Sequence, residues 1–225
     1  MYNIRMRKDP FIIGQYYHIY NRGTDKRIIF EDSFDLLRFF QSIQEFNTID
    51  PIGSIYENRF KDKQLGSRST KLVDIVCYCL NHNHYHFILT PLVENGIEKF
   101  MQKLGGGFTR YFNIKYERSG VLFQGKFKSI YIETDKYLMY LSAYVNLNNR
   151  IHKTLLGTPT TKSSWEEYIG GNKESICNKS IILDRYKNIE DYKKFAESVV
   201  QGVVRNRLQD DLNLDKDLLI EKIIK

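Results

Sequence analysis

The feature of this sequence that most restricts its fold is the order in which strand-like and helix-like hydrophobic patterns follow one another. Alternating apolar residues predict strands, whereas apolar residues spaced three and four apart predict helices. The order is strand, helix, strand, strand, helix, strand, helix, over residues 16–20, 33–46, 71–80, 84–90, 97–112, 121–132 and 135–149. The first six elements predict an α+β fold of ferredoxin-like (split βαβ) layout, an antiparallel sheet with helices on one face.

Local signals refine the predicted elements. Asp32 or Ser33 is placed to cap the first helix, and Asp135 to cap the last. The glycine triplet at 105–107 is costly in a helix, and we expect it to interrupt the second one. Residues 50–69 are polar and predict an exposed loop or loose hairpin.

Length and composition indicate a soluble globular protein of 225 residues, with 42% hydrophobic and 27% charged residues. We expect a catalytic domain over residues 1–158 and a C-terminal helical extension over residues 159–225. No apolar run is long enough for a membrane span, and residues 1–10 lack the apolar stretch of a signal peptide. These patterns predict a cytoplasmic protein without a membrane partner.

Charge and cysteine content point to a nucleic-acid partner in a reducing compartment. The formal net charge is +7 and aromatic residues reach 14%. Cations bind phosphates and rings stack on bases, so this combination favours nucleic-acid binding. The three cysteines, Cys77, Cys79 and Cys177, form no CxxC pair. An odd set of this kind argues against a disulfide framework.

The sharpest chemical signal is the pair His84 and His86, separated by Tyr85 on a predicted strand. Side chains alternate along a strand, so both imidazoles project from one face. Two neighbouring imidazoles can hold one divalent cation if a third ligand arrives from elsewhere. Alone, the pattern is a weak signal and is more typical of two half-buried histidines on a sheet.

The last predicted helix carries a tyrosine and an amide four residues apart, Tyr144 and Asn148. Residues at this spacing share a helix face. A tyrosine nucleophile and an amide oxygen for a metal would then point the same way. Tyr140 lies one turn earlier on nearly the same face and is the rival nucleophile, and core packing of Tyr144 is the alternative reading.

Several motifs in order resemble the HUH single-tyrosine transposases, in the REP-associated branch. The resemblance covers roughly residues 15–168 and rests on the segments Asn21-Arg22-Gly23, Tyr78-Cys79-Leu80, Asn83-His84-Tyr85-His86, Tyr111-Phe112-Asn113, Leu122 to Lys128, and Tyr144 to Asn148. A series of motifs is more specific than any one alone.

The resemblance implies a DNA transposase that cuts and rejoins single-stranded DNA through a 5′-phosphotyrosine. It implies that His84, His86 and Asn148 are the metal ligands and that Tyr144 is the nucleophile. Oxygen and imidazole ligands with a DNA substrate suggest Mg²⁺ or Mn²⁺. It also implies single-stranded or hairpin DNA as the partner, and a homodimer. We expect the nucleophilic hydroxyl to be accessible rather than deeply buried.

Basic residues concentrate between Lys99 and Lys128, where Glu117 is the only acid and aromatic residues interleave. This composition predicts a DNA-contact region. The candidate DNA-binding residues are Arg22, Arg110, Lys115, Lys126 and Lys128.

Two alternatives remain open. Cys77, Cys79, His82, His84 and His86 could form a small zinc-binding module, although no second ligand pair follows downstream. A non-catalytic RNA-binding domain with the same ferredoxin-like layout would place aromatic residues on the sheet face, where this chain has histidines.

Overall fold

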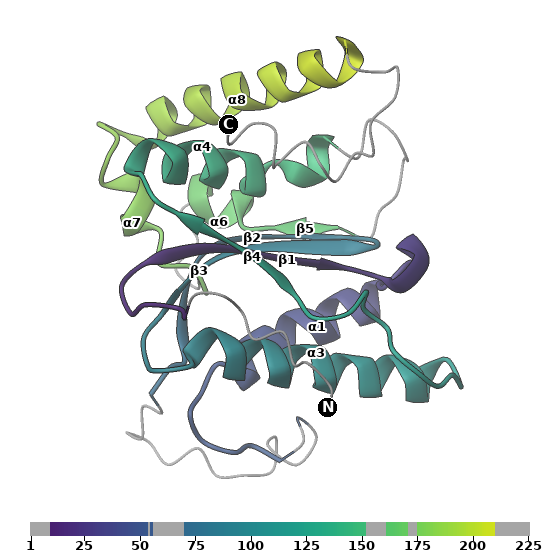
Figure 1. Cartoon of the computed structure of the whole chain (residues 1–225). Coiled ribbons are helices and arrows are strands. Elements are labelled where there is room, and N and C mark those ends of the chain that lie inside the picture. The colour runs from purple at the N-terminus through teal and green to yellow at the C-terminus, as the bar shows by residue number, and fades with distance from the viewer. Residues whose placement is uncertain (1–9, 54, 56–69, 152–160, 171–174, 210–225) are drawn as a thin grey trace, which may run out of the picture.

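The computed structural model describes residues 10–53, 55, 70–151, 161–170 and 175–209 (Figure 1). The predicted loop at 50–69 and the domain boundary at residue 158 fall largely outside the described residues. No helix in the described part is long and apolar enough to cross a membrane.

A five-stranded sheet forms the centre of the molecule, in the order β4-β1-β3-β2-β5. The strands are β1 (Tyr16–Arg22), β2 (Val73–Asn81), β3 (His84–Pro91), β4 (Lys128–Ile132) and β5 (Lys162–Ser163). Every neighbouring pair is antiparallel. The order of the first four strands is that of the split βαβ layout, so the predicted α+β class and antiparallel sheet are confirmed.

Helices cover both faces of the sheet (Figure 1). The helices α1 (Ser33–Phe46) and α3 (Gly96–Lys115) pack on one face, as expected for the first six elements. The opposite face is covered by α4 (Asp135–Asn146) and the C-terminal helices α6 (Trp165–Ile169), α7 (Ser180–Leu183) and α8 (Ile189–Gln209). The central strands β2 and β3 are buried along nearly their whole length, which requires cover on both sides.

The C-terminal helices are tied to α4 and β2 by buried polar contacts. The Asn146 amide donates to the Tyr192 hydroxyl of α8 at 2.8 Å. Ser164 Oγ accepts from the backbone N–H of Tyr78 in β2 at 2.9 Å and also contacts Asn146 Oδ1 at 2.5 Å. The described residues between 162 and 170 and between 175 and 206 therefore contribute to the core that α4 closes on this face.

The helix ends follow the local signals in one case and depart from them in another. Asp32 caps α1 and forms a capping box with Asp35, as the sequence predicts. At α4 the cap is Thr134, whose hydroxyl accepts from Tyr137 N–H at 3.2 Å, and Asp135 is the first helical residue. The α4 helix ends at Asn146 rather than near residue 149, and a further helical turn follows at 148–151.

The prediction that the glycine triplet interrupts a helix is wrong, because α3 runs unbroken from Gly96 to Lys115. Packing explains one of the three glycines. A Cβ on Gly107 would lie 2.7 Å from the ring of Phe46, so α1 and α3 approach too closely for any side chain there. A Cβ on Gly105 or Gly106 would meet nothing within 4 Å. Each of these two glycines destabilises the helix by about 0.5–1 kcal/mol relative to alanine, and packing does not explain its presence.

We predict opposite stability changes for two glycines of α3. Gly107→Ala forces the buried Phe46 ring to move, and overpacking of this kind costs about 1–3 kcal/mol, more than the helix gains from alanine. Gly105→Ala meets open space and should stabilise the protein by about 0.5–1 kcal/mol. Urea denaturation measures both changes, and equal stability of the two variants would contradict the close α1–α3 contact.

Candidate active site

The candidate site lies at the start of β3, where side-chain alternation separates two environments. The rings of His84 and His86 lie on the α4 face, and the His86 ring centroid is 6.2 Å from that of Tyr144. Tyr85 points the opposite way and packs against Phe39 of α1 and Phe123. The shared face predicted for the two histidines is therefore present, with the candidate nucleophile beside it.

The hydrogen bonds of His84 fix its tautomer. Its Nδ1 lies 2.6 Å from Asn83 Oδ1, an oxygen that can only accept, so Nδ1 carries the proton. The lone pair is then on Nε2, which lies 2.9 Å from the Asn81 amide nitrogen. This arrangement leaves Nε2 as the nitrogen able to ligate a cation.

His86 is oriented by a second histidine, His18 of β1. His86 Nδ1 lies 2.9 Å from His18 Nε2, and the two rings stack with centroids 5.1 Å apart. His18 is fully buried, and burial lowers its pKa to about 3, so its ring is neutral at neutral pH. One proton is therefore shared by two facing nitrogens, and either ring can be the donor.

Asn81 joins the end of β2 to the third predicted ligand. Its amide nitrogen donates to Asn148 Oδ1 at 2.7 Å while lying 2.9 Å from His84 Nε2. Asn148 is completely buried, and its own amide nitrogen has no hydrogen-bond partner among the residues that the structure describes. Asn148 thus reaches the histidine pair from the helical turn that follows α4, rather than from the α4 face that the four-residue spacing implied.

Tyr144 is more buried than the sequence analysis expected. The residue as a whole is 6% exposed, so the expectation that Tyr144 is not deeply buried is wrong for this conformation. The physical reason is that α4 lies between the sheet and α8, and Tyr144 is on the inner side of α4.

The other tyrosines of α4 lie close to Tyr144 and influence one another. Burial, and then the proximity of Tyr144, raises the pKa of Tyr140. Burial, and then the neighbouring Tyr140, Tyr20 and Tyr144, raises the pKa of Tyr137 to about 12. Tyr140 and Tyr137 are therefore protonated at neutral pH. Both lie in the same cluster as Tyr144, and Tyr140 remains the rival nucleophile.

Two of the candidate DNA-binding residues flank the histidine face. Arg22 pairs in register with His84, and its guanidinium bonds the Gln124 side chain. Lys128 is exposed on the edge strand β4, opposite Tyr20, with its ammonium 5.8 Å from the centre of the Tyr20 ring. Both cations are placed to meet a phosphate chain that approaches the histidines.

The remaining candidates lie on the α3 side. Arg110 and Lys126 are exposed and line a cavity on the opposite face of the sheet. Lys115 is instead ion-paired at 2.7 Å with Asp32 and with the fully buried Asp35. Its charge is compensated within the protein, and its role in DNA binding stays a prediction.

The structure disfavours both alternative readings. Cys77 and Cys79 are fully buried, and burial raises the pKa of Cys79 to about 12 and that of Cys77 well above its usual value. Within the described ranges, no three His, Cys, Asp or Glu residues are grouped to hold a metal. An RNA-binding sheet needs an open face, whereas helices cover both faces here (Figure 1).

Three residues of the site were not identified from the sequence: His18, Asn81 and Asn83. His18 shares a strand face with Tyr16 and Tyr20, but alternation alone does not show which strand lies beside β3. The pairing of β1 with β3 supplies that information. Asn81 is the last residue of β2, and Asn83 lies in the two-residue turn that follows it. Asparagine is common at such turns for conformational reasons, so neither residue was assigned a chemical role of its own.

Comparison with known proteins supports the class that the fold and site define. Residues 53–148 match the family model described as "Transposase IS200 like", a stretch that contains His84, His86 and Tyr144 and ends at Asn148. The predicted resemblance to the tyrosine transposases is thereby confirmed as a similarity: residues 53–148 are similar to the IS200-like transposases. No curated protein sequence matches the chain.

A solved structure, described as the REP-associated tyrosine transposase bound to a REP hairpin, has a similar fold. The TM-score is 0.51 at 13% sequence identity, covering 77% of this chain and 90% of that chain. At this identity the likeness shows the fold alone.

We predict that His18 sets the metal affinity of this site through His86. His18→Phe keeps an aromatic ring in the stack but removes the hydrogen-bonding nitrogen, so Mn²⁺ affinity should fall about 10–100-fold. His18→Gln retains a polar group at that position and should lose less. Isothermal titration calorimetry without DNA measures both variants. Unchanged Mn²⁺ affinity in folded His18→Phe would show that the contact is only structural.

Proposed function

We propose that this protein cleaves and rejoins single-stranded DNA, with Tyr144 as nucleophile and a divalent cation held by His84, His86 and Asn148. The observation that carries the proposal is the convergence of two imidazoles, one amide oxygen and one tyrosine from β3, α4 and the turn after it. The IS200-like family match over the same residues supports it.

The donor set fits Mg²⁺ or Mn²⁺. His84 Nε2 carries a lone pair, and Asn148 Oδ1 is the second donor atom. The Asn81 amide nitrogen lies between these two atoms and contacts both. A cation would take the place of that amide nitrogen, so the Asn81 side chain must turn when a metal binds. The proposal also requires His86 Nδ1–H to donate a hydrogen bond to His18 Nε2. The lone pair of His86 Nε2 is then available to the metal. When bound, the cation offsets charge on the phosphate oxygens in the transition state.

The chemistry assigned to Tyr144 is a transesterification. Its phenolic oxygen loses a proton and attacks a DNA phosphorus, a new bond forms to the tyrosine oxygen, and the bond to the 3′ oxygen breaks. The products are a 5′-phosphotyrosine and a free 3′-hydroxyl, and the number of phosphoester bonds is conserved. A second 3′-hydroxyl can reverse the step without a nucleotide cofactor. A tyrosine with an ordinary pKa near 10 needs activation for this role.

Access of DNA to Tyr144 requires a local change. With the residue only 6% exposed, little of the Tyr144 side chain is available to a strand lying on the protein surface. The polar surroundings of Asn148 and the histidines lie on one side of the ring, and Lys128 and Arg22 lie at the border of the same face. We propose that the DNA strand enters over β4 and β1 and displaces part of this cover.

The DNA partner is proposed to be single-stranded or a hairpin. The structurally similar protein is bound to a REP hairpin, and the net charge of +7 in this chain favours a phosphate backbone. A homodimer remains a proposal from the family resemblance.

We predict that the double variant His84→Ala, His86→Ala loses metal-dependent cleavage while it keeps its fold. His84 is partly exposed, whereas His86 is buried and contacts His18. The double variant should therefore lose some stability as well as the metal, but the apolar core on both faces of the sheet is left intact. Cleavage of labelled hairpin DNA with Mn²⁺ is the assay, with circular dichroism as the check on folding. Retained Mn²⁺-dependent cleavage would refute the metal assignment.

We predict that Tyr144→Phe abolishes the covalent protein–DNA adduct. The change removes a single oxygen and leaves the ring packing nearly intact, so DNA binding should persist through cations and rings. The adduct is detected as a shifted band on a denaturing gel after incubation with labelled hairpin DNA and Mn²⁺.

The matched controls are Tyr137→Phe and Tyr140→Phe on the same helix, and both should still form the adduct. Loss of the adduct in Tyr140→Phe, with retention in Tyr144→Phe, would move the nucleophile by one helical turn. Retention in all three variants would exclude α4 as its source. Because Tyr144 is buried, unfolding of Tyr144→Phe would instead favour a core-packing role.

A further inference from the structure

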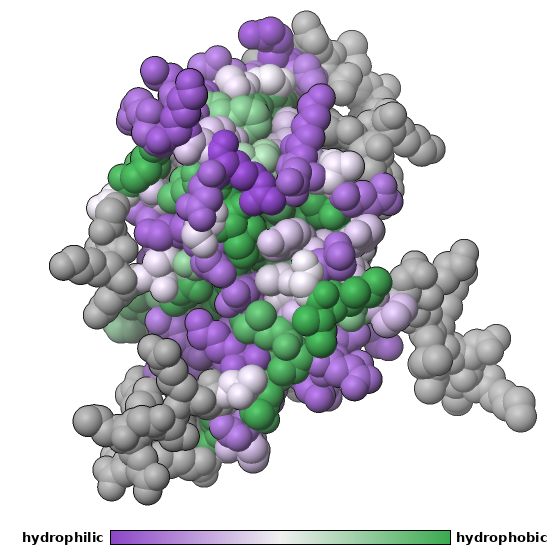
Figure 2. Space-filling view, turned by 90° about the vertical axis from the view of Figure 1, so that its left-hand side faces the viewer, coloured by the Kyte–Doolittle hydropathy of each residue, from purple (hydrophilic) through white to green (hydrophobic). Residues whose placement is uncertain are grey.

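The two ends of the sheet differ in chemistry. Figure 2 looks onto the end where β1 begins and β3 finishes, and apolar side chains form a band there among hydrophilic ones. Ile12, Ile13 and Leu92, which flank the start of β1 and the end of β3, are exposed. At the other end, where β2 passes into β3, the last residue of β2 is the fully buried Asn81. A buried amide needs hydrogen-bond partners, and those of Asn81 are chemically significant.

Asn81 lies in the middle of the candidate metal site. It pairs with His84 across the β2–β3 ladder, and side chains opposite each other in an antiparallel pair share a sheet face. Its amide nitrogen lies 2.9 Å from His84 Nε2 and donates to Asn148 Oδ1 at 2.7 Å. Both hydrogens of this amide are therefore directed at the two atoms that the proposed function assigns to the cation.

The oxygen of the Asn81 amide has a much weaker contact. Asn81 Oδ1 accepts from the Cys79 thiol, whose sulfur is 3.8 Å away. A thiol is a weak donor, and its sulfur is also a weak acceptor. A half turn about the Cβ–Cγ bond of Asn81 would exchange Oδ1 and Nδ2, and the amide nitrogen would then face the same sulfur. The contact with Cys79 therefore opposes this turn only weakly.

The other side of the amide opposes the turn as long as no cation is bound. After the turn, Asn81 Oδ1 would face His84 Nε2 and Asn148 Oδ1, so three atoms with lone pairs would converge without a hydrogen between them. Such a convergence is unfavourable by itself, and it is the environment that a divalent cation requires. The orientation of the Asn81 amide therefore depends on the cation.

The distances suit the turned orientation. Mg²⁺ takes an octahedral set of ligands at about 2.1 Å, so neighbouring ligand atoms lie about 3 Å apart. The amide position of Asn81 is 2.9 Å from His84 Nε2 and 2.7 Å from Asn148 Oδ1. An oxygen at that position would have the spacing to both atoms that neighbouring ligands of one ion have.

We propose that Asn81 is a further ligand of the cation, through Oδ1, once its amide has made this half turn. The proposal rests on the proposed function in that the cation site is taken from it. The cation takes over the role of the amide nitrogen as the group between His84 and Asn148, and the Asn81 side chain stays in the site. Two imidazoles and two amide oxygens then leave the remaining positions of the octahedron for phosphate oxygens.

One substitution separates a ligand from a group that merely fills the site. Asn81→Leu keeps the approximate size of the side chain and removes both amide atoms. If Asn81 is a ligand, Mn²⁺ affinity falls by at least the 10–100-fold, roughly, that the loss of an outer-shell partner costs. Isothermal titration calorimetry without DNA measures the affinity. If the amide only occupies the site until a cation displaces it, the affinity is unchanged or higher, and the proposal is overturned.

Asn81→Asp is the second variant. A carboxylate presents an oxygen in either orientation and adds a negative charge, so Mn²⁺ should bind at least about tenfold more tightly than to the wild type. Circular dichroism shows whether each variant is folded. Where Asn81→Leu does not fold, Asn81→Asp decides the question, because unchanged or weaker Mn²⁺ affinity in that variant overturns the proposal.

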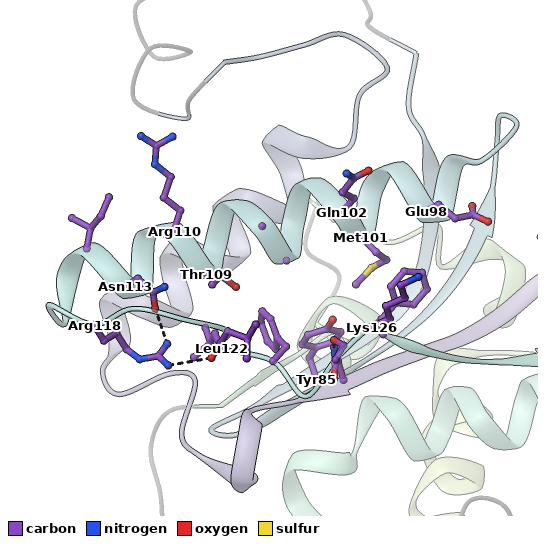
Figure 3. A pocket seen from close by; sticks show the side chains of 18 residues that line it. Tyr85, Glu98, Met101, Gln102, Thr109, Arg110, Asn113, Arg118, Leu122 and Lys126 are labelled. Carbon is purple, nitrogen blue, oxygen red and sulfur yellow. Dashed lines mark hydrogen bonds between the residues drawn. The ribbon is translucent and has the colours of Figure 1, made fainter. Parts of the chain in front are cut away.

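Asn21→Leu is the matched control. Asn21 is a buried asparagine of β1 that pairs with Tyr85, and both residues line the cavity shown in Figure 3 on the other face of the sheet. Its amide donates to Gly125 O at 3.2 Å. Its Mn²⁺ affinity should equal that of the wild type. A fall as large as in Asn81→Leu would reveal a general effect of losing a buried amide and would overturn the proposal.

The relaxation rate of water protons around the Mn²⁺-loaded protein gives a second readout, because it reports how many water molecules bind the ion. Water fills a ligand position that the protein no longer occupies. Asn81→Leu should therefore show one more bound water than the wild type, and Asn81→Asp the same number as the wild type. Equal hydration of the ion in the wild type and Asn81→Leu overturns the proposal.

Failure of this proposal is distinguishable from failure of the proposed function. If Asn81→Leu binds Mn²⁺ as the wild type does while the His84→Ala, His86→Ala variant does not, the metal site stands and the assignment of Asn81 falls. If Asn81→Leu loses affinity and gains a water, but the wild type forms no adduct with hairpin DNA, Asn81 is a ligand and the cleavage proposal falls. A wild type that binds no Mn²⁺ overturns both.

Discussion

The Nδ1 contacts of His84 and His86 decide what this site can do. An imidazole ligates a cation only through a nitrogen that carries a lone pair, so the position of the remaining proton matters as much as the position of the ring. Asn83 holds the proton of His84 on Nδ1, and His18 faces Nδ1 of His86. Asn83 contributes an amide oxygen, and His18 contributes a neutral, fully buried ring. His18 lies in strand β1, and Asn83 lies in the turn between β2 and β3. The orientation of the two imidazoles is therefore set by short side chains on the sheet and its turn.

The alternation of side chains along β3 connects this site to the rest of the molecule. His84 and His86 face α4, while Tyr85 between them faces α1 and lines the cavity beneath α3. A shift of the strand register by one residue would exchange these environments and destroy both. The register is fixed by pairing on both sides of β3, with β1 and with β2, and by the cover of helices on each face. The fold therefore places the histidine site on one face of the sheet and the cavity beneath α3 on the other.

The sequence was sufficient to predict the sheet, its antiparallel class and the shared face of the two histidines, because those depend on periodicity. The cap of α1 was predictable as Asp32 or Ser33, and the structure shows that it is Asp32. His18 was not, because its role depends on which strand lies beside β3. The unbroken α3 was not predicted, because the glycines suggested a helix break. Gly107 is instead required by the close Phe46 ring of α1, a residue more than sixty positions away along the chain. The burial of Tyr144 depends on cover by α4 and α8 together, which no local pattern records.

The most direct measurement of this account is pulsed electron paramagnetic resonance of the protein with Mn²⁺ bound and no DNA present. Electron spin echo modulation reports nitrogen nuclei that ligate the ion. The account predicts couplings from two imidazole nitrogens in the wild type, from one in His84→Ala and from one in His86→Ala. A bound Mn²⁺ that shows no imidazole nitrogen coupling, or a coupling that both single variants leave unchanged, would contradict the assignment of these histidines as the ligands.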